Sequence, residues 1–163
     1  MFQRIQQIRE ELSEMIHYHF LVNKTVVGVG GAFNAGKSFF LNSILMNGKT
    51  VLPVDTRPTT AVPTYIVKDS SRSDFMIQAT TLFQQTVQLD EEEFEKCTHR
   101  TDFSIAPLID HFSVYLPSIS YSNIVFLDTP GYSKADSLCG MPGNRTDRGI
   151  AKNQLTKTNC LIW

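Results

Sequence analysis

Eight consecutive residues, Gly31-Ala32-Phe33-Asn34-Ala35-Gly36-Lys37-Ser38, have the types and the spacing that bind phosphate. They follow the pattern of a glycine, four free positions, then Gly-Lys-Ser or Gly-Lys-Thr. The glycines allow the backbone to wrap around phosphate oxygens, so that several N–H groups converge on them. Lys37 would then reach the β- and γ-phosphates, and the Ser38 hydroxyl would bind the Mg²⁺ that bridges them. The stretch predicts a nucleoside-phosphate site. The alternative is a glycine-rich turn that precedes a Lys-Ser pair by chance.

A second stretch that could do chemistry, Asp128-Thr129-Pro130-Gly131, directly follows the apolar run of residues 124–127. An uninterrupted apolar run is typical of a central parallel strand that is buried on both faces. Ligands of open α/β sheets bind at the carboxyl ends of the strands, so we expect Asp128 beside the phosphate loop, where it would support the Mg²⁺ shell. Gly131 would bring its backbone N–H to the γ-phosphate and release it on hydrolysis.

A third stretch, residues 51–63, is rich in proline and threonine and is therefore expected to be an extended loop. A nucleotide-switch protein needs a threonine here whose hydroxyl meets Mg²⁺ and whose backbone meets the γ-phosphate. Thr59 and Thr60 are both candidates.

The elements that must position these residues can be read from hydrophobic spacing. A β-branched run at residues 25–29 predicts a buried strand before the phosphate loop, and apolar residues at helical spacing predict a helix over 38–46 after it. We therefore expect a three-layer α/β phosphate-loop fold with a mostly parallel sheet. The other expected strands lie at 64–67, 75–78, 87–89, 112–116, 124–127 and 159–163, with further helices that begin at the acidic turn 90–95 and at 147.

An amphipathic helix is predicted over residues 3–22, upstream of the nucleotide fold. Apolar residues such as Ile5, Ile8 and Leu12 fall on one side and charged residues on the other. The helix either caps the edge of the domain or belongs to a separate bundle. Its hydrophobic repeat of about 3.5 residues is compatible with both. The expected organisation is therefore residues 1–22 as an N-terminal helix and residues 23–163 as the nucleotide-binding domain.

Length, charge and cysteine content limit the classes of protein to which this chain can belong. The chain has 163 residues, 42% of them hydrophobic, enough for one sizeable core, and its net charge of −1 argues against a nucleic-acid partner. The start is too charged for a signal peptide, and no apolar run reaches transmembrane length. The three cysteines lack metal-ligand spacing, which predicts reduced thiols in the cytoplasm. The histidines at 17, 19, 99 and 111 are scattered, so they are interpreted as ordinary structural residues.

These motifs together resemble the GTPase domain of the dynamin superfamily, and most closely that of the bacterial dynamin-like proteins. The matches are the phosphate loop, the Leu52-Pro53 … Pro58-Thr59-Thr60-Ala61 segment, residues 128–131, and Asn159-Cys160-Leu161-Ile162. The resemblance implies that Thr60 is the switch I threonine and that residues 129–131 open switch II. It also implies GTP hydrolysis with Mg²⁺, assembly of a homodimer or homo-oligomer through the GTPase domain, and a membrane partner for the full-length protein, which would be cytoplasmic or peripheral on the membrane.

The sequence departs from the common small GTPases in two places. Tyr132 stands where those proteins carry a water-orienting glutamine, and no Asn-Lys-x-Asp or Thr-Lys-x-Asp guanine-reading motif is present. We therefore expect the GTPase domain to be truncated on its C-terminal side, and guanine specificity comes from the resemblance alone.

Tyr132 offers no amide to orient water, so another group must offset the charge that develops between the β- and γ-phosphates. The position of Asn34 resembles that of the asparagine of potassium-activated GTPases and the serine of dynamins, which implies a bound K⁺ or Na⁺. The alternative is that Asn34 only makes hydrogen bonds within the loop.

Two other functions remain open at this point: an RNA- or ribosome-associated GTPase, which the near-neutral charge disfavours, and a non-hydrolysing fragment that acts as a binding module. The residues expected to act in catalysis are Lys37, Thr60, Asn34 and Gly131, and those expected to hold Mg²⁺ are Ser38, Thr60 and Asp128. The expected nucleotide-binding residues are Gly31, Asn34, Ala35, Gly36, Lys37, Ser38, Phe39, Thr60, Asp128 and Gly131.

Overall fold

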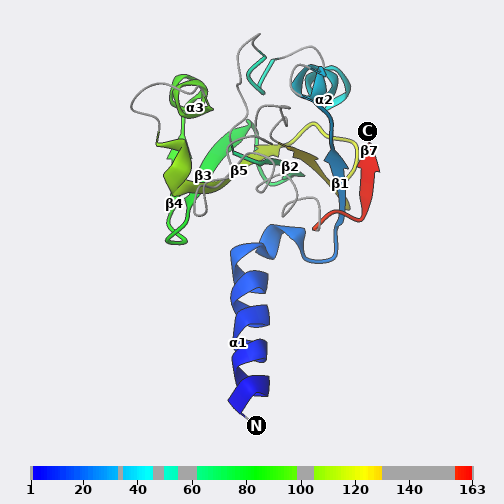
Figure 1. Ribbon diagram of the computed structural model, residues 1–163. Coiled ribbons are helices and arrows are strands. Elements are labelled where there is room, and N and C mark those ends of the chain that lie inside the picture. The colour runs from blue at the N-terminus through cyan, green and yellow to red at the C-terminus, as the bar shows by residue number, and fades with distance from the viewer. Residues whose placement is uncertain are drawn as a thin grey trace.

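The chain forms an α/β domain around one seven-stranded sheet (Figure 1). The computed structural model describes residues 2–32, 35–45, 50–54, 62–98, 105–129 and 157–162. The elements in chain order are α1 (Phe2–His17), the 3₁₀ turn η1 (His19–Leu21), β1 (Thr25–Val29), α2 (Lys37–Leu45), β2 (Thr64–Lys68), β3 (Met76–Thr81), β4 (Thr86–Leu89), α3 (Glu91–Thr98), the 3₁₀ turn η2 (Ala106–Leu108), β5 (Ile109–Leu116), β6 (Ile124–Asp128) and β7 (Cys160–Ile162).

The strands lie in the order β4-β3-β5-β2-β6-β1-β7. Strand β1 pairs in parallel with β6 and β7, and β2 pairs in parallel with β5. Antiparallel pairing joins β2 to β6, and β3 to both β5 and β4. Strands β3 and β4 are consecutive and joined by a tight turn, a connection that only antiparallel strands allow. The predicted α/β fold is confirmed, with parallel pairing around β1, where the phosphate loop begins, and a mixed sheet beyond it.

The two faces of the sheet carry alternate residues of each strand, as a period of two requires. Ile66, Phe126 and Phe112 point to the face that α2 and α3 cover through Leu41 and Phe94. Their neighbours point to the opposite face, where Phe20 of η1 packs against them; this second group includes Val26, Tyr65, Val67, Val125 and Leu127. Strands β2 and β6 are thus buried on both faces, and β6 is confirmed as a central strand.

Helix α1 extends away from the sheet and from the side that α2 and α3 occupy (Figure 1). Its apolar side chains face solvent: Ile5 is 61% exposed and Leu12 is 53% exposed. The helix ends at His17, earlier than the expected residue 22, because residues 19–21 tighten into η1 so that Phe20 can reach the core. Such exposure is unlike a helix that caps the edge of a domain.

The remaining predicted strands form within a few residues of the expected bounds, and the acidic turn at 90–95 does begin a helix, α3. Asp90 accepts a hydrogen bond from the Glu93 N–H, and the Glu93 carboxylate accepts one from the Asp90 N–H. This reciprocal arrangement satisfies two donors that a helix start leaves free. The helix expected to begin at 147 lies outside the described residues. Among the helices that the structure describes, none is long and apolar enough to cross a membrane.

Candidate phosphate-binding site

The predicted phosphate loop connects the end of β1 to the start of α2, so it has the strand-loop-helix context that the motif needs. Gly31 has a φ of 146° and Gly36 a φ of 82°, which side chains with a Cβ rarely adopt. A Cβ on Gly31 would also lie 3.3 Å from the Cβ of Ala35. Both glycines of the motif are therefore required by the path of the backbone.

Lys37, at the first position of α2, folds back over this loop. Its ammonium donates hydrogen bonds to the carbonyl oxygens of Ala32, at 3.1 Å, and Gly31, at 3.4 Å. The side chain is 9% exposed, and burial lowers the pKa of Lys37 while the nearby Asp128 carboxylate raises it. Neutral carbonyls are weaker acceptors than phosphate oxygens, so a bound phosphate would compete for this ammonium.

Ser38 and Asp128 meet although they are ninety positions apart in the chain. The Ser38 hydroxyl donates a 2.6 Å hydrogen bond to Asp128 Oδ2. The register of the parallel pair explains the meeting, since Val29 at the end of β1 lies opposite Asp128 at the end of β6. The sequence prediction that Asp128 emerges beside the phosphate loop therefore agrees with this geometry.

Asp128 is 1% exposed, and its second carboxylate oxygen, Oδ1, has no hydrogen-bond partner among the described residues. Burial raises the pKa of Asp128 to about 6, against the Ser38 hydrogen bond and the Lys37 charge, which both lower it. A buried carboxylate with a free oxygen is costly unless a cation or donor joins it. Hydroxyl and carboxylate oxygens are the ligands that Mg²⁺ prefers, so the residues present fit this ion.

Two further residues fix the base of the phosphate loop by hydrogen bonds, and their roles were not predicted from the sequence. The Thr129 hydroxyl, 1% exposed, donates a 2.8 Å hydrogen bond to the Val29 carbonyl and so fixes the chain after β6 against the end of β1. The Gly30 N–H, just before the loop, donates to the Ile162 carbonyl of β7 at 2.9 Å. The base of the loop is thus held by the strands on both sides of β1.

Asn42 is the third residue whose role was not predicted from the sequence. It is 7% exposed on α2, where its amide Nδ2 donates to the Leu52 carbonyl at 2.8 Å. Its Oδ1 accepts from the N–H groups of Leu52, at 3.0 Å, and Val51, at 3.3 Å. Asn42 therefore anchors the start of the Pro- and Thr-rich segment to the helix that follows the phosphate loop. The sequence feature that could have indicated this role is the presence of an asparagine inside an apolar helical run.

The other predicted site residues divide into two groups. Ala35 lies in the loop, where its N–H donates to the Ala32 carbonyl at 3.2 Å, and Phe39 is 63% exposed on the first turn of α2. The expected roles of Asn34, Thr60 and Gly131, and of the alternative Thr59, fall on positions outside the described residues.

The fold and the loop together define a phosphate-loop α/β protein. The sequence model of the dynamin family matches residues 27–162, and the chain therefore belongs to the dynamin family. No curated protein matches the chain.

Two solved structures of similar fold come from work on an oligomerised bacterial dynamin pair that provides a mechanism for the long-range sensing and tethering of membranes. One is 24% identical, with a TM-score of 0.55 over 78% of this chain and 19% of its own. The other is 20% identical, with a TM-score of 0.59 over 96% of this chain and 22% of its own. This chain thus spans about a fifth of the length of those proteins, and the likeness extends to the fold.

Proposed function

We propose that this chain is the nucleotide-binding part of a dynamin-like GTPase, which binds GTP with Mg²⁺ and hydrolyses it to GDP and phosphate. The observation that carries the proposal is the 2.6 Å contact between Ser38 and the buried Asp128, beside the loop that Lys37 covers. A hydroxyl and a carboxylate at the ends of adjacent elements, next to a lysine and a glycine loop, form the set that phosphoryl transfer from a nucleoside triphosphate needs.

Each residue has a distinct task in this proposal. Lys37 leaves the loop carbonyls and binds the β- and γ-phosphate oxygens, where it stabilises the charge of the transferring group. Ser38 and Thr60 hold Mg²⁺, with Asp128 behind them, and the ion supplies neutralisation of the phosphate charge. Gly131 senses the γ-phosphate through its backbone N–H. Guanine as the base follows from membership of the dynamin family.

For the full-length protein we propose nucleotide-driven assembly into a homodimer or homo-oligomer and a role in remodelling membranes, as a cytoplasmic protein that binds them peripherally. The support is the family and the two similar structures, which belong to an oligomerised pair connected with membrane tethering.

The test is titration of the purified chain with GTP and with ATP, each with and without Mg²⁺. We expect Mg²⁺-dependent binding of GTP and weaker binding of ATP. Lys37→Ala should abolish nucleotide binding, because the phosphates lose the cation that the motif supplies, whereas Lys96→Ala, an exposed lysine on α3, should leave it unchanged. Ser38→Ala should remove the Mg²⁺ dependence, and Ser43→Ala, at an exposed position five residues further along α2, should preserve it. Unchanged affinity in a folded Lys37→Ala protein would refute the phosphate site.

We also propose that turnover in the full-length protein requires a monovalent cation, K⁺ or Na⁺, with Asn34 as a ligand. The reason is that Tyr132 offers no amide to the attacking water, so a cation would offset the charge between the phosphates. Hydrolysis rates in K⁺, Na⁺ and a bulky organic cation at constant ionic strength should differ for the wild type and converge for Asn34→Ala. A wild type that is indifferent to the cation would make Asn34 a structural residue of the loop.

A further inference from the structure

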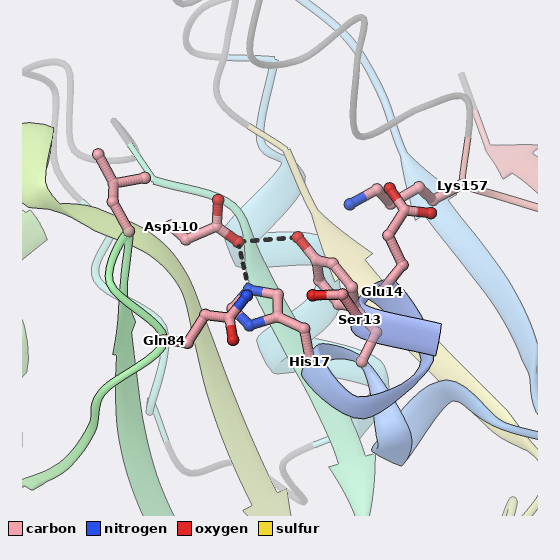
Figure 2. A pocket seen from close by; sticks show the side chains of 8 residues that line it. Ser13, Glu14, His17, Gln84, Asp110 and Lys157 are labelled. Carbon is pink, nitrogen blue, oxygen red and sulfur yellow. Dashed lines mark hydrogen bonds and ion pairs between the residues drawn. The ribbon is translucent and has the colours of Figure 1, made fainter. Parts of the chain in front are cut away.

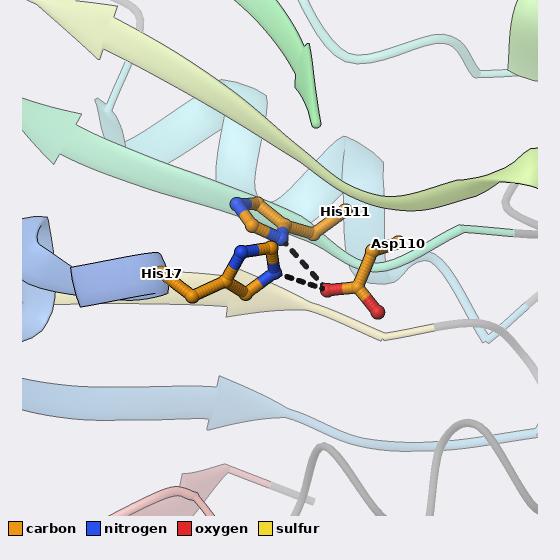
Figure 3. A group of neighbouring side chains, drawn as sticks. All are labelled: His17, Asp110 and His111. Carbon is orange, nitrogen blue, oxygen red and sulfur yellow. Dashed lines mark hydrogen bonds and ion pairs between the residues drawn. The ribbon is translucent and has the colours of Figure 1, made fainter. Parts of the chain in front are cut away.

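Two histidines that are distant in the sequence meet around one carboxylate, on the opposite face of the sheet from α2. His17 Nε2 at the end of α1 lies 3.1 Å from Asp110 Oδ2 on β5, and His111 Nδ1 lies 3.0 Å from the same oxygen (Figure 3). One ligand atom from each of the three residues lies within 4.8 Å of the other two. The interpretation of these histidines as scattered structural residues is therefore incomplete, because folding brings two of them together.

The rings of this cluster are held in place by aromatic neighbours. His111 is 1% exposed and stacks on Tyr18, with ring centroids 5.1 Å apart. The His17 ring is nearly perpendicular to both of these rings, with its centroid 4.7 Å from that of Tyr18 and 5.3 Å from that of His111. The Tyr18 hydroxyl donates a 2.8 Å hydrogen bond to Asp110 Oδ2. Packing that fixes the rotamers of ligating groups, with a second group that orients the carboxylate, is what a metal site requires.

We propose that His17, Asp110 and His111 form a binding site for a divalent transition-metal cation of the Zn²⁺ class. Two imidazoles and one carboxylate are ligands that Zn²⁺ accepts, with a fourth position open to water. A tetrahedral ion with bonds of about 2.0–2.1 Å keeps its ligand atoms roughly 3.3 Å apart. The two histidine–carboxylate separations, 3.1 and 3.0 Å, are close to this, and the two histidine nitrogens lie within 4.8 Å of each other, so binding an ion would require the two rings to close on it.

A cavity of about 320 Å³ beside the cluster gives an ion access from solvent. His17, Asp110, Glu14 and Lys157 line it, with His17 and Glu14 reaching in from α1 (Figure 2). The charges on its walls oppose one another. The Asp110 and Glu14 carboxylates attract a cation, whereas the Lys157 ammonium, 3.7 Å above the Tyr18 ring, repels one. This arrangement predicts that the metal affinity rises when the Lys157 charge is removed.

A metal at this position would join two parts of the molecule. His17 is the last residue of α1, and Asp110 and His111 belong to β5 of the sheet. The ion would therefore fix the end of the projecting helix to the nucleotide-binding domain. The residues involved are separate from those of the phosphate site, so this proposal can be tested independently of the GTPase function.

The test is titration of the metal-free chain with Co²⁺, followed by its visible ligand-field absorption. Millimolar Mg²⁺ is present throughout to occupy the Ser38 and Asp128 site. We expect saturation at one equivalent, displacement by Zn²⁺, and an increase in Tm on addition of Zn²⁺. His17→Gln and Asp110→Asn should each weaken Co²⁺ binding about tenfold or more, because loss of a ligand costs at least as much as loss of a supporting group.

Two further variants distinguish the site from general binding to histidine or carboxylate. His19→Gln, an exposed histidine two residues from His17, should bind Co²⁺ as the wild type does, and Lys157→Met should bind it more tightly. The His17 side chain is largely buried, at 13% exposed, so circular dichroism must establish that His17→Gln is folded before its Co²⁺ affinity is compared. Absence of saturable binding, equal affinity in folded His17→Gln, or absorption typical of thiolate ligation would each overturn the proposal. The cluster would then be a hydrogen-bonded contact between α1 and β5.

Discussion

Asp128 shows how the demands of folding and of ligand binding conflict at a single residue. One oxygen of its carboxylate accepts the Ser38 hydrogen bond, and the other has no partner among the described residues. Burial raises its pKa to about 6, whereas its usual value is 3.8. The negative charge that would attract Mg²⁺ is therefore unfavourable in the folded protein until a cation arrives.

This conflict predicts a pH dependence. The folded-state pKa is above the unfolded one, so without Mg²⁺ the folded chain holds this proton more tightly than the unfolded chain. The free energy of unfolding therefore loses the contribution of Asp128 as the pH rises from about 4 to 6, a loss on the order of 3 kcal/mol. Asp128→Asn carries no charge, so its stability relative to wild type should increase over this interval.

The measurement is urea unfolding of both proteins between about pH 4 and pH 7 in a chelator, with the difference between them plotted against pH. Taking the difference removes the titration of every other group. In the presence of Mg²⁺ and nucleotide, the wild type should instead gain stability relative to Asp128→Asn as the pH rises, because the variant lacks the charge that supports the ion. A difference that is independent of pH would mean that Asp128 is ionised at no cost in the folded chain.

At the scale of elements, α2 connects the phosphate loop to the segment that contains the predicted switch I threonine. The connection is the buried amide of Asn42, which makes three hydrogen bonds to the backbone of residues 51 and 52. Leu52, 1% exposed, packs into the core beside it. The segment that leads toward Thr60 therefore starts from a fixed point at Val51 and Leu52.

Asn42→Ala should lower the free energy of unfolding by about 2–4 kcal/mol, because buried backbone groups of residues 51 and 52 lose their partners. The matched control is Ser43→Ala on the exposed side of the same helix, where we expect a change within about 0.5 kcal/mol. Chemical denaturation measures both. If Asn42→Ala were as mild as Ser43→Ala, water would be replacing the amide and the segment would not depend on it.

At the scale of the whole molecule, the N-terminal 22 residues contain two kinds of apolar side chain. Phe20 is 9% exposed and packs with Tyr65 and Val125, whereas the apolar residues along α1 are mostly half exposed or more. The helix thus adds little to the core of this chain. Such an exposed apolar stripe is of the kind that packs against other helices, and membership of a helical bundle stays a prediction.

Leu12→Gln should therefore change the free energy of unfolding by less than about 0.5 kcal/mol, since the side chain is already 53% exposed. Phe20→Ala, eight residues further along the chain and buried in the core, should lower the free energy of unfolding by about 3 kcal/mol or more. Thermal and urea unfolding of the two variants test this contrast. A large loss for Leu12→Gln would show that the α1 face is covered in solution, by a second copy or by another part of the protein.

The sequence by itself determined the features that depend on local spacing. The phosphate loop was predictable because its glycines, lysine and serine act within eight consecutive residues. Strand β6 was predictable because burial on both faces demands an unbroken apolar run, and β1 was predictable because β-branched residues favour strands. The start of α3 was predictable because carboxylates favour the first turn of a helix. Each of these is a short-range rule, and the family membership of the chain follows from several such motifs in order.

Tertiary structure alone decided the features that depend on which strands become neighbours. The position of Asp128 beside the phosphate loop was predicted, but the unpartnered Oδ1 and the raised pKa come from burial at the carboxyl end of the central strand β6. The meeting of His17 with Asp110 and His111 had no signal in the sequence, because 93 positions separate His17 from Asp110. The antiparallel pairing of β2 with β6 and of β3 with β5 likewise could not be predicted from the sequence. Strand order is set by the packing of the whole core, and hydrophobic alternation within a strand carries no information about its neighbour.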